Sequence, residues 1–192
     1  MKISAKNSFL KATLLVVAGM AFVFGMNAQT NSGNESKTGM VTVNINLSSI
    51  QSLVINTAQQ TVDINYTTAA NYKEGVSVTQ NDHLIAFSTG GYSISVQSDG
   101  DFKSGTDNIP ASDVTVKATA GTGNDKTSTF APIKLGTTGG KIITSAIGTG
   151  GDLKFNVEYD NKAEATDNYK TLNTANSTKT YTAKVTYTIA PA

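Results

Sequence analysis

Apolar and polar residues alternate along most of the chain after position 40. A two-residue period places the apolar side chains on one face of an extended strand, so that one face packs in a core and the other meets solvent. The first alternating stretch has its apolar positions at Val41, Val43, Ile45 and Leu47. The last and longest stretch runs over residues 180–189, with Tyr181, Ala183, Val185, Tyr187 and Ile189 on one face.

The same period recurs between these two stretches. It predicts strands at residues 62–66, 76–78, 92–96, 114–116 and 153–159. Less periodic apolar stretches, at residues 53–55, 84–87, 130–135 and 142–147, fit strands buried on both faces or at a sheet edge. Glycine-rich turn clusters separate the stretches, at residues 88–91, 98–101, 120–124 and 148–151. The pattern predicts nine to eleven strands.

This spacing of strands and turns favours an all-β fold, a two-sheet antiparallel β-sandwich of the immunoglobulin-like or pilin-like kind. A barrel or a threonine-rich solenoid would also alternate, although the stretches show no repeat of fixed length. Helix is scarce. Residues 67–74 fit a single turn, and residues 161–170 form a charged connector with weak helical potential.

The first 28 residues differ from the rest of the chain. Lys2, Lys6 and Lys11 precede an apolar run over residues 12–26, and the small Ala28 follows. This order is typical of a secretory signal peptide, and the run is shorter than the roughly 20 residues of a membrane-spanning helix. A retained N-terminal anchor is the alternative. Residues 29–39 are polar and read as a flexible leader, so residues 40–192 are the predicted domain.

Composition excludes several classes of function. The chain has no cysteine, which removes disulfides, thiolate metal sites, a cysteine nucleophile and a lipidated cysteine. All fifteen basic residues are lysines, and removal of the first 28 residues leaves 12 basic against 14 acidic residues, a net charge of −2. Such a chain is a poor ligand for nucleic acid. We expect no transmembrane segment in the mature chain.

Candidate chemistry is sparse. The single histidine, His83, follows Asp82 in an apparent turn entering a strand, where the two side chains would point in opposite directions; we expect a turn or surface histidine rather than a catalytic one. Asp99, Asp101 and Asp107 have spacings that calcium loops sometimes use, but the motif departs from the helix-flanked calcium loop at nearly every defining position, so we favour a solvated hairpin loop over a calcium site. No pair of carboxylates is singled out. The sequence therefore predicts no enzyme, no catalytic or metal-binding residue and no cofactor.

Glycine-rich patches at residues 136–140 and 148–151 precede strand-like segments rather than helices, so we interpret them as turns and not as phosphate loops. Most tyrosine and phenylalanine residues fall within the alternating stretches. They therefore belong to the predicted core before they form an aromatic platform for sugars.

Two segments carry a resemblance to a known family. Val-Thr-Val-Asn-Ile-Asn-Leu, residues 41–47, and Thr-Tyr-Thr-Ala-Lys-Val-Thr-Tyr-Thr-Ile, residues 180–189, look like the corresponding ends of cysteine-free fimbrial subunits of the chaperone-usher type. In that family the sandwich lacks one strand, which a periplasmic chaperone and then the next subunit supplies. The resemblance implies that Val41, Val43, Ile45 and Leu47 form a donor strand. It implies that Tyr181, Ala183, Val185, Tyr187 and Ile189 line the groove or form the edge that a chaperone grips.

The expected function is that of a secreted, non-enzymatic surface protein, a fimbrial subunit or adhesin assembled by β-strand addition. Its partners would be copies of itself or other subunits and a periplasmic chaperone. The Gln-Thr start after Met-Asn-Ala, residues 26–30, resembles export signals of Bacteroidetes-type bacteria and suggests a Gram-negative surface, fimbrium or periplasm. The alternative is a monomeric binding module that recognises glycan or a cell surface, with residues 41–47 as the ordinary first strand of a complete domain.

Overall fold

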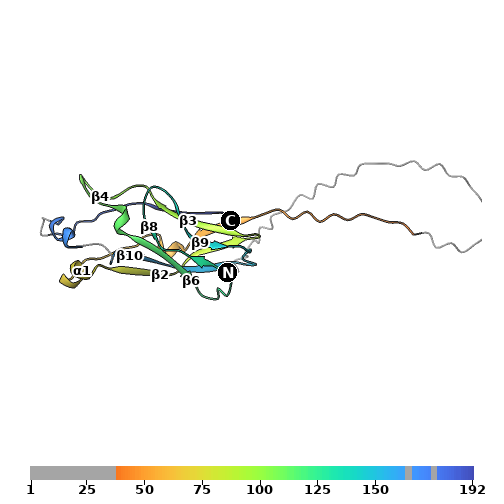
Figure 1. The fold of residues 1–192 in the computed structure, drawn as a ribbon, viewed down its shortest axis with the longest axis horizontal. Coiled ribbons are helices and arrows are strands. Elements are labelled where there is room, and N and C mark those ends of the chain that lie inside the picture. The colour runs from red at the N-terminus through yellow and green to blue at the C-terminus, as the bar shows by residue number, and fades with distance from the viewer. Residues whose placement is uncertain (1–37, 163–165, 174–176) are drawn as a thin grey trace, which may run out of the picture. The chain divides into compact units, whose positions relative to one another are not determined.

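The computed structural model describes residues 38–162, 166–173 and 177–192, and its fold is mostly β (Figure 1). The predicted signal peptide, 1–28, and all but the last two residues of the predicted leader lie outside the described residues. Residues 45–192 form one compact body, and residues 38–44 are a separate unit. No helix in the described part of the chain has the length and apolar character needed to cross a membrane.

Eleven strands lie in the described residues, within the predicted range, and every pair is antiparallel. A five-stranded sheet has the order β1-β2-β10-β6-β8. Its strands are β1 (Gln51–Ile55), β2 (Ser77–Ser88), β10 (Leu153–Asp160), β6 (Thr115–Ala120) and β8 (Ile133–Lys134). A four-stranded sheet has the order β11-β3-β9-β7. Its strands are β11 (Val185–Pro191), β3 (Tyr92–Ser98), β9 (Gly140–Ser145) and β7 (Thr129–Phe130).

The remaining elements are short. Strands β4 (Phe102–Ser104) and β5 (Asp107–Ile109) pair with each other as a hairpin. The part of the chain that the structure describes also contains the 3-10 helices η1 (Thr57–Gln59), η2 (Ala111–Asp113) and η3 (Thr166–Thr171). The α-helix of the described residues, α1 (Ala69–Glu74), falls within the stretch where the sequence predicts one helical turn. Thr68 and Asn71 form a reciprocal capping box at its start, and Gly75 ends it at a φ of 74°.

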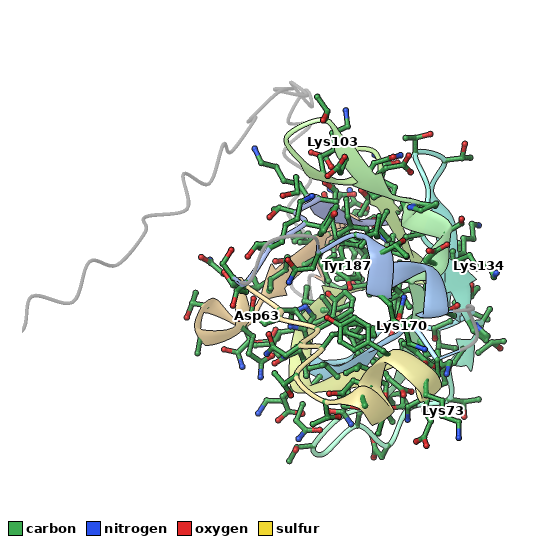
Figure 2. All side chains as sticks on the ribbon, turned by 90° about the vertical axis from the view of Figure 1, so that its left-hand side faces the viewer. Asp63, Lys73, Lys103, Lys134, Lys170 and Tyr187 are labelled. Carbon is green, nitrogen blue, oxygen red and sulfur yellow. The ribbon has the colours of Figure 1, made fainter. Side chains whose placement is uncertain are left out.

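The predicted alternation is clearest in β10. Leu153, Phe155, Val157 and Tyr159 are buried, and the residues between them are half-buried. Residues from both large sheets form one apolar core. Its largest fully buried apolar side chains come from β2, β6 and β10 of the five-stranded sheet and from β3 and β9 of the four-stranded sheet: Leu84, Val116, Phe155, Val157, Tyr92, Ile94, Val96, Ile142 and Ile143. Figure 2 shows that charged side chains lie outside this core: Lys73, Lys103 and Lys134 are at the periphery, whereas Tyr187 lies toward the middle.

Three predicted strands depart from the structure. Residues 41–47 and 62–66 form no strand, and in the last stretch the strand begins only at Val185, after an isolated bridge between Lys103 and Thr182. Alternation sets which side chains share a face, whereas a strand also needs a neighbouring backbone to pair with. Within the described residues, the stretches 41–47 and 62–66 lack that partner, and residues 180–184 pair with a neighbouring backbone only at Thr182 and Lys184.

Candidate functional site

The predicted donor segment is exposed. The side chains of Val41, Val43, Ile45 and Leu47 are 87, 79, 82 and 92% exposed. The polar residues between them are exposed as well. The first strand of the fold, β1, starts only at Gln51. The sequence prediction that residues 41–47 form an alternating strand with a buried face is therefore wrong for this chain alone, and the segment instead presents four unburied apolar side chains.

The stretch 181–189, predicted to line a groove or form an edge, ends in strand β11. Strand β11 pairs with β3 on one side and is the outermost strand of its sheet. Val185, Tyr187 and Ile189 pack against the core yet stay only partly buried. Tyr181 and Ala183, also half-buried, lie in the stretch before the strand begins. Of the five predicted residues, three therefore lie in β11 and two precede it.

The backbone of this segment has one occupied and one open edge. The amide of Asp99 donates to the carbonyl of Lys184 at 2.9 Å, and Thr182 exchanges two 3.0 Å bonds with Lys103. The amide of Ala192 donates to the carbonyl of Gly91 at 3.2 Å. Even-numbered residues therefore bond inward, toward β3 and the β4–β5 hairpin. Because successive backbone groups point to opposite edges, the N–H and C=O groups of Val185, Tyr187 and Ile189 face outward.

A buried polar chain supports this edge from inside. The hydroxyl oxygens of Tyr187 and Tyr159 lie 2.6 Å apart, and the Tyr159 oxygen lies 3.1 Å from Nε2 of His83. Nδ1 of His83 lies 3.0 Å from Oε1 of Gln59, so Nδ1 carries the proton and donates it to the amide oxygen. Nε2 then accepts from Tyr159, which accepts from Tyr187. Burial lowers the pKa of His83 and raises the pKa values of Tyr159 and Tyr187.

The expectation of a turn or surface histidine is wrong, because His83 is 2% exposed and lies within β2. The reason is a bulge. Between its pairings with Val157 and Phe155 of β10, strand β2 contains extra residues, and Asp82 there adopts a φ of 52°. The two extra residues leave the inward parity of Gln80 and Leu84 unchanged, so His83 is buried as part of the bulge itself, directly before Leu84. The carboxylate of Asp82 bonds instead to the Thr122 amide and Lys154.

The three aspartates of the calcium hypothesis each serve a local partner. Asp99 accepts from the Lys184 amide at 2.9 Å, and Asp107 pairs with Lys179. Asp101 accepts from the Ala111 amide and the Asn108 side chain, both at 3.0 Å, and these bonds lower its pKa. Within the described residues, no group of three or more histidine or acidic side chains is placed to hold a metal ion.

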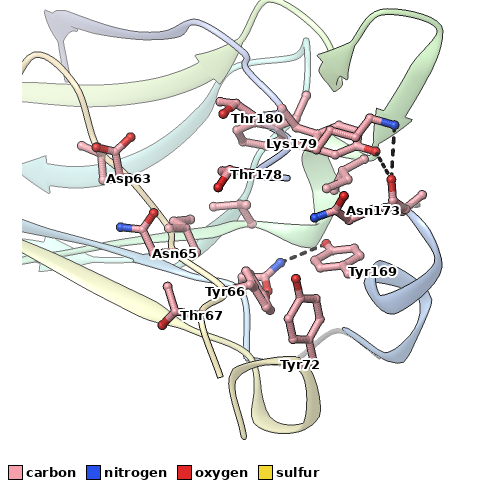
Figure 3. A pocket seen from close by; sticks show the side chains of 18 of the residues that line it. Asp63, Asn65, Tyr66, Thr67, Tyr72, Tyr169, Asn173, Thr178, Lys179 and Thr180 are labelled. Atoms are coloured by element: carbon pink, nitrogen blue, oxygen red, sulfur yellow. Dashed lines mark hydrogen bonds between the residues drawn. The ribbon is translucent and has the colours of Figure 1, made fainter. Parts of the chain in front are cut away.

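A cavity of about 750 Å³ lies beside the stretch that precedes β11 (Figure 3). Its walls come from the extended residues 62–67, from α1 and η3, from the β4–β5 hairpin and from residues 177–181. Tyr66, Tyr72 and Tyr169 form one wall, and Figure 3 shows Thr178 and Thr180 across the opening from them. None of the three tyrosines was singled out from the sequence.

The tyrosine wall is anchored from behind. Ring centroids of Tyr66 lie 5.1 Å from those of Tyr72 and 5.6 Å from those of Tyr169. The Tyr66 hydroxyl bonds to Oδ1 of Asn161, which is 2% exposed. The Tyr169 hydroxyl donates to Asp113 at 2.6 Å and accepts from Asn161 Nδ2 at 3.1 Å. Burial, with the Asp113 carboxylate nearby, raises the pKa of Tyr66 to about 12 and raises that of Tyr169 further.

A signal for this wall exists in the sequence. Tyr72 and Tyr169 are aromatic residues in two stretches, 67–74 and 161–170, that lack the alternation of a strand. No periodic pattern there predicts that these side chains belong to the core of a sheet. Aromatic residues in such connectors favour a surface cluster over a sheet core.

Scans against models of known protein families and searches of curated proteins find no match to this chain.

Proposed function

We propose that this chain is a non-enzymatic structural subunit of a surface fibre, exported from a Gram-negative cell and assembled by addition of residues 41–47 to the sheet edge of another copy. The observation that carries the proposal is that one chain contains both an unpaired strand-like segment and an unpaired strand edge. One is an alternating apolar segment without a buried face, and the other is an open strand edge with half-buried apolar side chains.

The free energy gained when exposed apolar side chains are buried supports residues 41–47 as the donor strand. Four large apolar side chains in seven residues are exposed, and each gains about 1.5–3 kcal/mol when fully buried. An alternating segment presents all four to one surface as soon as it becomes a strand. Addition to a sheet edge supplies both the backbone partner and the apolar surface, which is the physics of β-augmentation.

The acceptor side is supported by the lengths of the open edges. Of the four outermost strands in the two large sheets, β7 and β8 contain two residues each and β1 contains five. Strand β11 contains seven, the length of the segment 41–47. It therefore offers the longest ladder to an incoming strand.

The half-buried apolar residues line one side of the core. Strands β1 and β11, the outermost strands of different sheets, lie next to each other. The inward residues of both stay partly buried, whereas the core residues of β2, β3 and β10 are almost fully buried. We interpret the two sheets as a sandwich of the immunoglobulin-like kind with no strand between these edges. Because Cα atoms of β1 and β11 lie within 8 Å of each other, less than the roughly 9.6 Å of two strand spacings, β1 must move away from β11 when a strand is added there. A donated strand there would cover Leu53, Ile55, Val185 and Ile189. Such an unfinished core also needs a chaperone before assembly.

The test uses the mature chain from Gln29, refolded from denaturant at high concentration. We expect polymers by size-exclusion chromatography with light scattering and by negative-stain electron microscopy. Val43→Asp with Ile45→Asp removes the apolar face and is expected to leave monomers. The matched control, Thr42→Asp with Asn44→Asp, adds the same charge at alternate positions and should still polymerise. Monomers at every concentration for the unaltered chain would reject assembly by strand addition.

A further inference from the structure

The cavity beside the tyrosine wall has no part in strand addition, and its lining has its own chemistry. Its volume of about 750 Å³ lies in the range of small-molecule sites, about 300–1,000 Å³, and exceeds the needs of a single sugar ring. The lining combines apolar groups, such as Phe102, Ile109 and Leu172, with amides and hydroxyls. It belongs entirely to the body of residues 45–192.

One wall offers fixed aromatic faces. The hydroxyls of Tyr66 and Tyr169 are bonded to Asn161 and Asp113, so these rings are held in place before any ligand arrives. Tyr72 packs against Tyr66 at 54° and is half-buried, so part of its surface stays accessible. A rigid aromatic face binds with little loss of conformational entropy. It suits a ligand with flat apolar patches, such as the C–H face of a pyranose ring.

The other lining groups are polar and mostly uncharged. Asn65, Thr178 and Thr180 are exposed at the cavity, and Figure 3 shows them apart from the tyrosines. Amides and hydroxyls both donate and accept hydrogen bonds, which matches the hydroxyl groups at the edge of a sugar ring. This combination, apolar faces beside polar edges, favours a carbohydrate over an apolar ligand.

The charges select against an anion. Among the described residues that line the cavity, only Asp63 and Lys179 carry charge. The Lys179 ammonium pairs with Asp107 and donates to the carbonyl of Leu172 at 3.2 Å, and the bond to Asp107 raises its pKa. Its charge is therefore already compensated, whereas Asp63 adds a negative charge to the lining. A sialic acid, uronic acid or phosphate group would meet this carboxylate without a free cation.

From these observations we propose that the cavity is a binding site for a neutral oligosaccharide of more than one sugar unit, with a ring against Tyr72 and hydroxyls bonded to Asn65 and Thr178. The site is independent of the assembly proposed above. A chain with both activities would be an adhesive subunit, and a chain with this one alone would be a monomeric glycan-binding module.

The test starts from an array of neutral and acidic oligosaccharides probed with the mature chain, followed by isothermal titration calorimetry with the best neutral glycan. Tyr72→Ala should weaken binding at least tenfold, and Tyr72→Phe, which keeps the ring, should retain it. Asn65→Ala should weaken binding about three- to tenfold, whereas Thr137→Ala, on an exposed loop outside the lining, should change nothing. Circular dichroism and thermal midpoints identify any variant that fails to fold.

Three outcomes would overturn the proposal. They are the absence of millimolar or tighter binding to any neutral glycan, a preference for acidic glycans, and equal affinity of a folded Tyr72→Ala variant. The chain carrying Val43→Asp and Ile45→Asp, which is not expected to assemble, must bind glycan as well as the unaltered chain. That variant separates a failure of this site from a failure of assembly.

Discussion

At the scale of single residues, the bulge at Asp82 explains why the one histidine is buried. The extra residues in β2 turn His83 into the core, where Gln59 and Tyr159 satisfy both ring nitrogens of the neutral form. Protonation would place a second N–H donor against Tyr159 and a charge in an apolar surrounding. The fold therefore favours the neutral ring.

This preference predicts a pH dependence of stability. Because the folded-state pKa of His83 is lowered by burial, the unfolded chain binds a proton more readily than the folded chain as the pH falls below about 6.5. The contribution of neutral His83 is thus present at neutral pH and lost toward acid, with a slope of up to about 1.4 kcal/mol per pH unit. Urea unfolding of the unaltered chain and of His83→Gln, from pH 7.5 to 5.0, checks this.

The unfolding free energies of the unaltered chain and of His83→Gln should converge as the pH falls, because only the unaltered chain loses stability when the unfolded state protonates this histidine. Acidic residues contribute equally to both and cancel in the difference. A constant difference in unfolding free energy across the range would contradict the assignment of His83 as a buried neutral group.

At the scale of elements, alternation in the sequence predicts the well-paired strands and fails where pairing is missing. The stretches 92–96 and 153–159 correspond to β3 and β10, and residues 53–55 lie in β1. The stretches 76–78 and 84–87 merge into one strand, β2, because the residues between them form a bulge rather than a turn. A bulge depends on the partner strand, which the local sequence does not specify.

Only the β11 part of the candidate site could be predicted from the sequence. The tyrosine wall, like the bulge in β2, depends on residues far away in the chain. Tyr187 and its neighbours in β11 follow from alternation, and their role as a groove or chaperone-bound edge stays a prediction. The tyrosine wall depends on long-range contacts: Asn161 reaches Tyr66 across 95 positions of the chain, and Asp113 reaches Tyr169 across 56. No local periodicity carries such contacts.

The open edge of β11 leads to a prediction for the strand itself. The amide of Val185 faces outward, so Val185→Pro removes a donor that the ladder with β3 does not use. We expect this variant to fold and to lose polymerisation. Val185→Ala controls for lost packing and should still polymerise. Thr186→Pro removes an inward amide and should destabilise the fold by about 1–3 kcal/mol. Chemical denaturation and light scattering measure both effects, and polymerisation of folded Val185→Pro would exclude the outer edge of β11 as the acceptor.

At the scale of the whole molecule, strand addition couples folding to concentration. A core that a second copy completes is stabilised by mass action, so the thermal midpoint of the mature chain should rise with protein concentration. Above the dissociation constant, each tenfold increase adds about 1.4 kcal/mol, or about 3–5 °C for a domain of this size. The variant with Val43→Asp and Ile45→Asp should show a lower midpoint that does not depend on concentration. If residues 41–47 instead completed their own domain, the unaltered chain would also melt at one temperature at all concentrations, while the variant would still melt lower. Calorimetric scans at 10 and 100 µM, chosen to differ by that factor of about ten, therefore separate donation to a neighbour from closure within one chain.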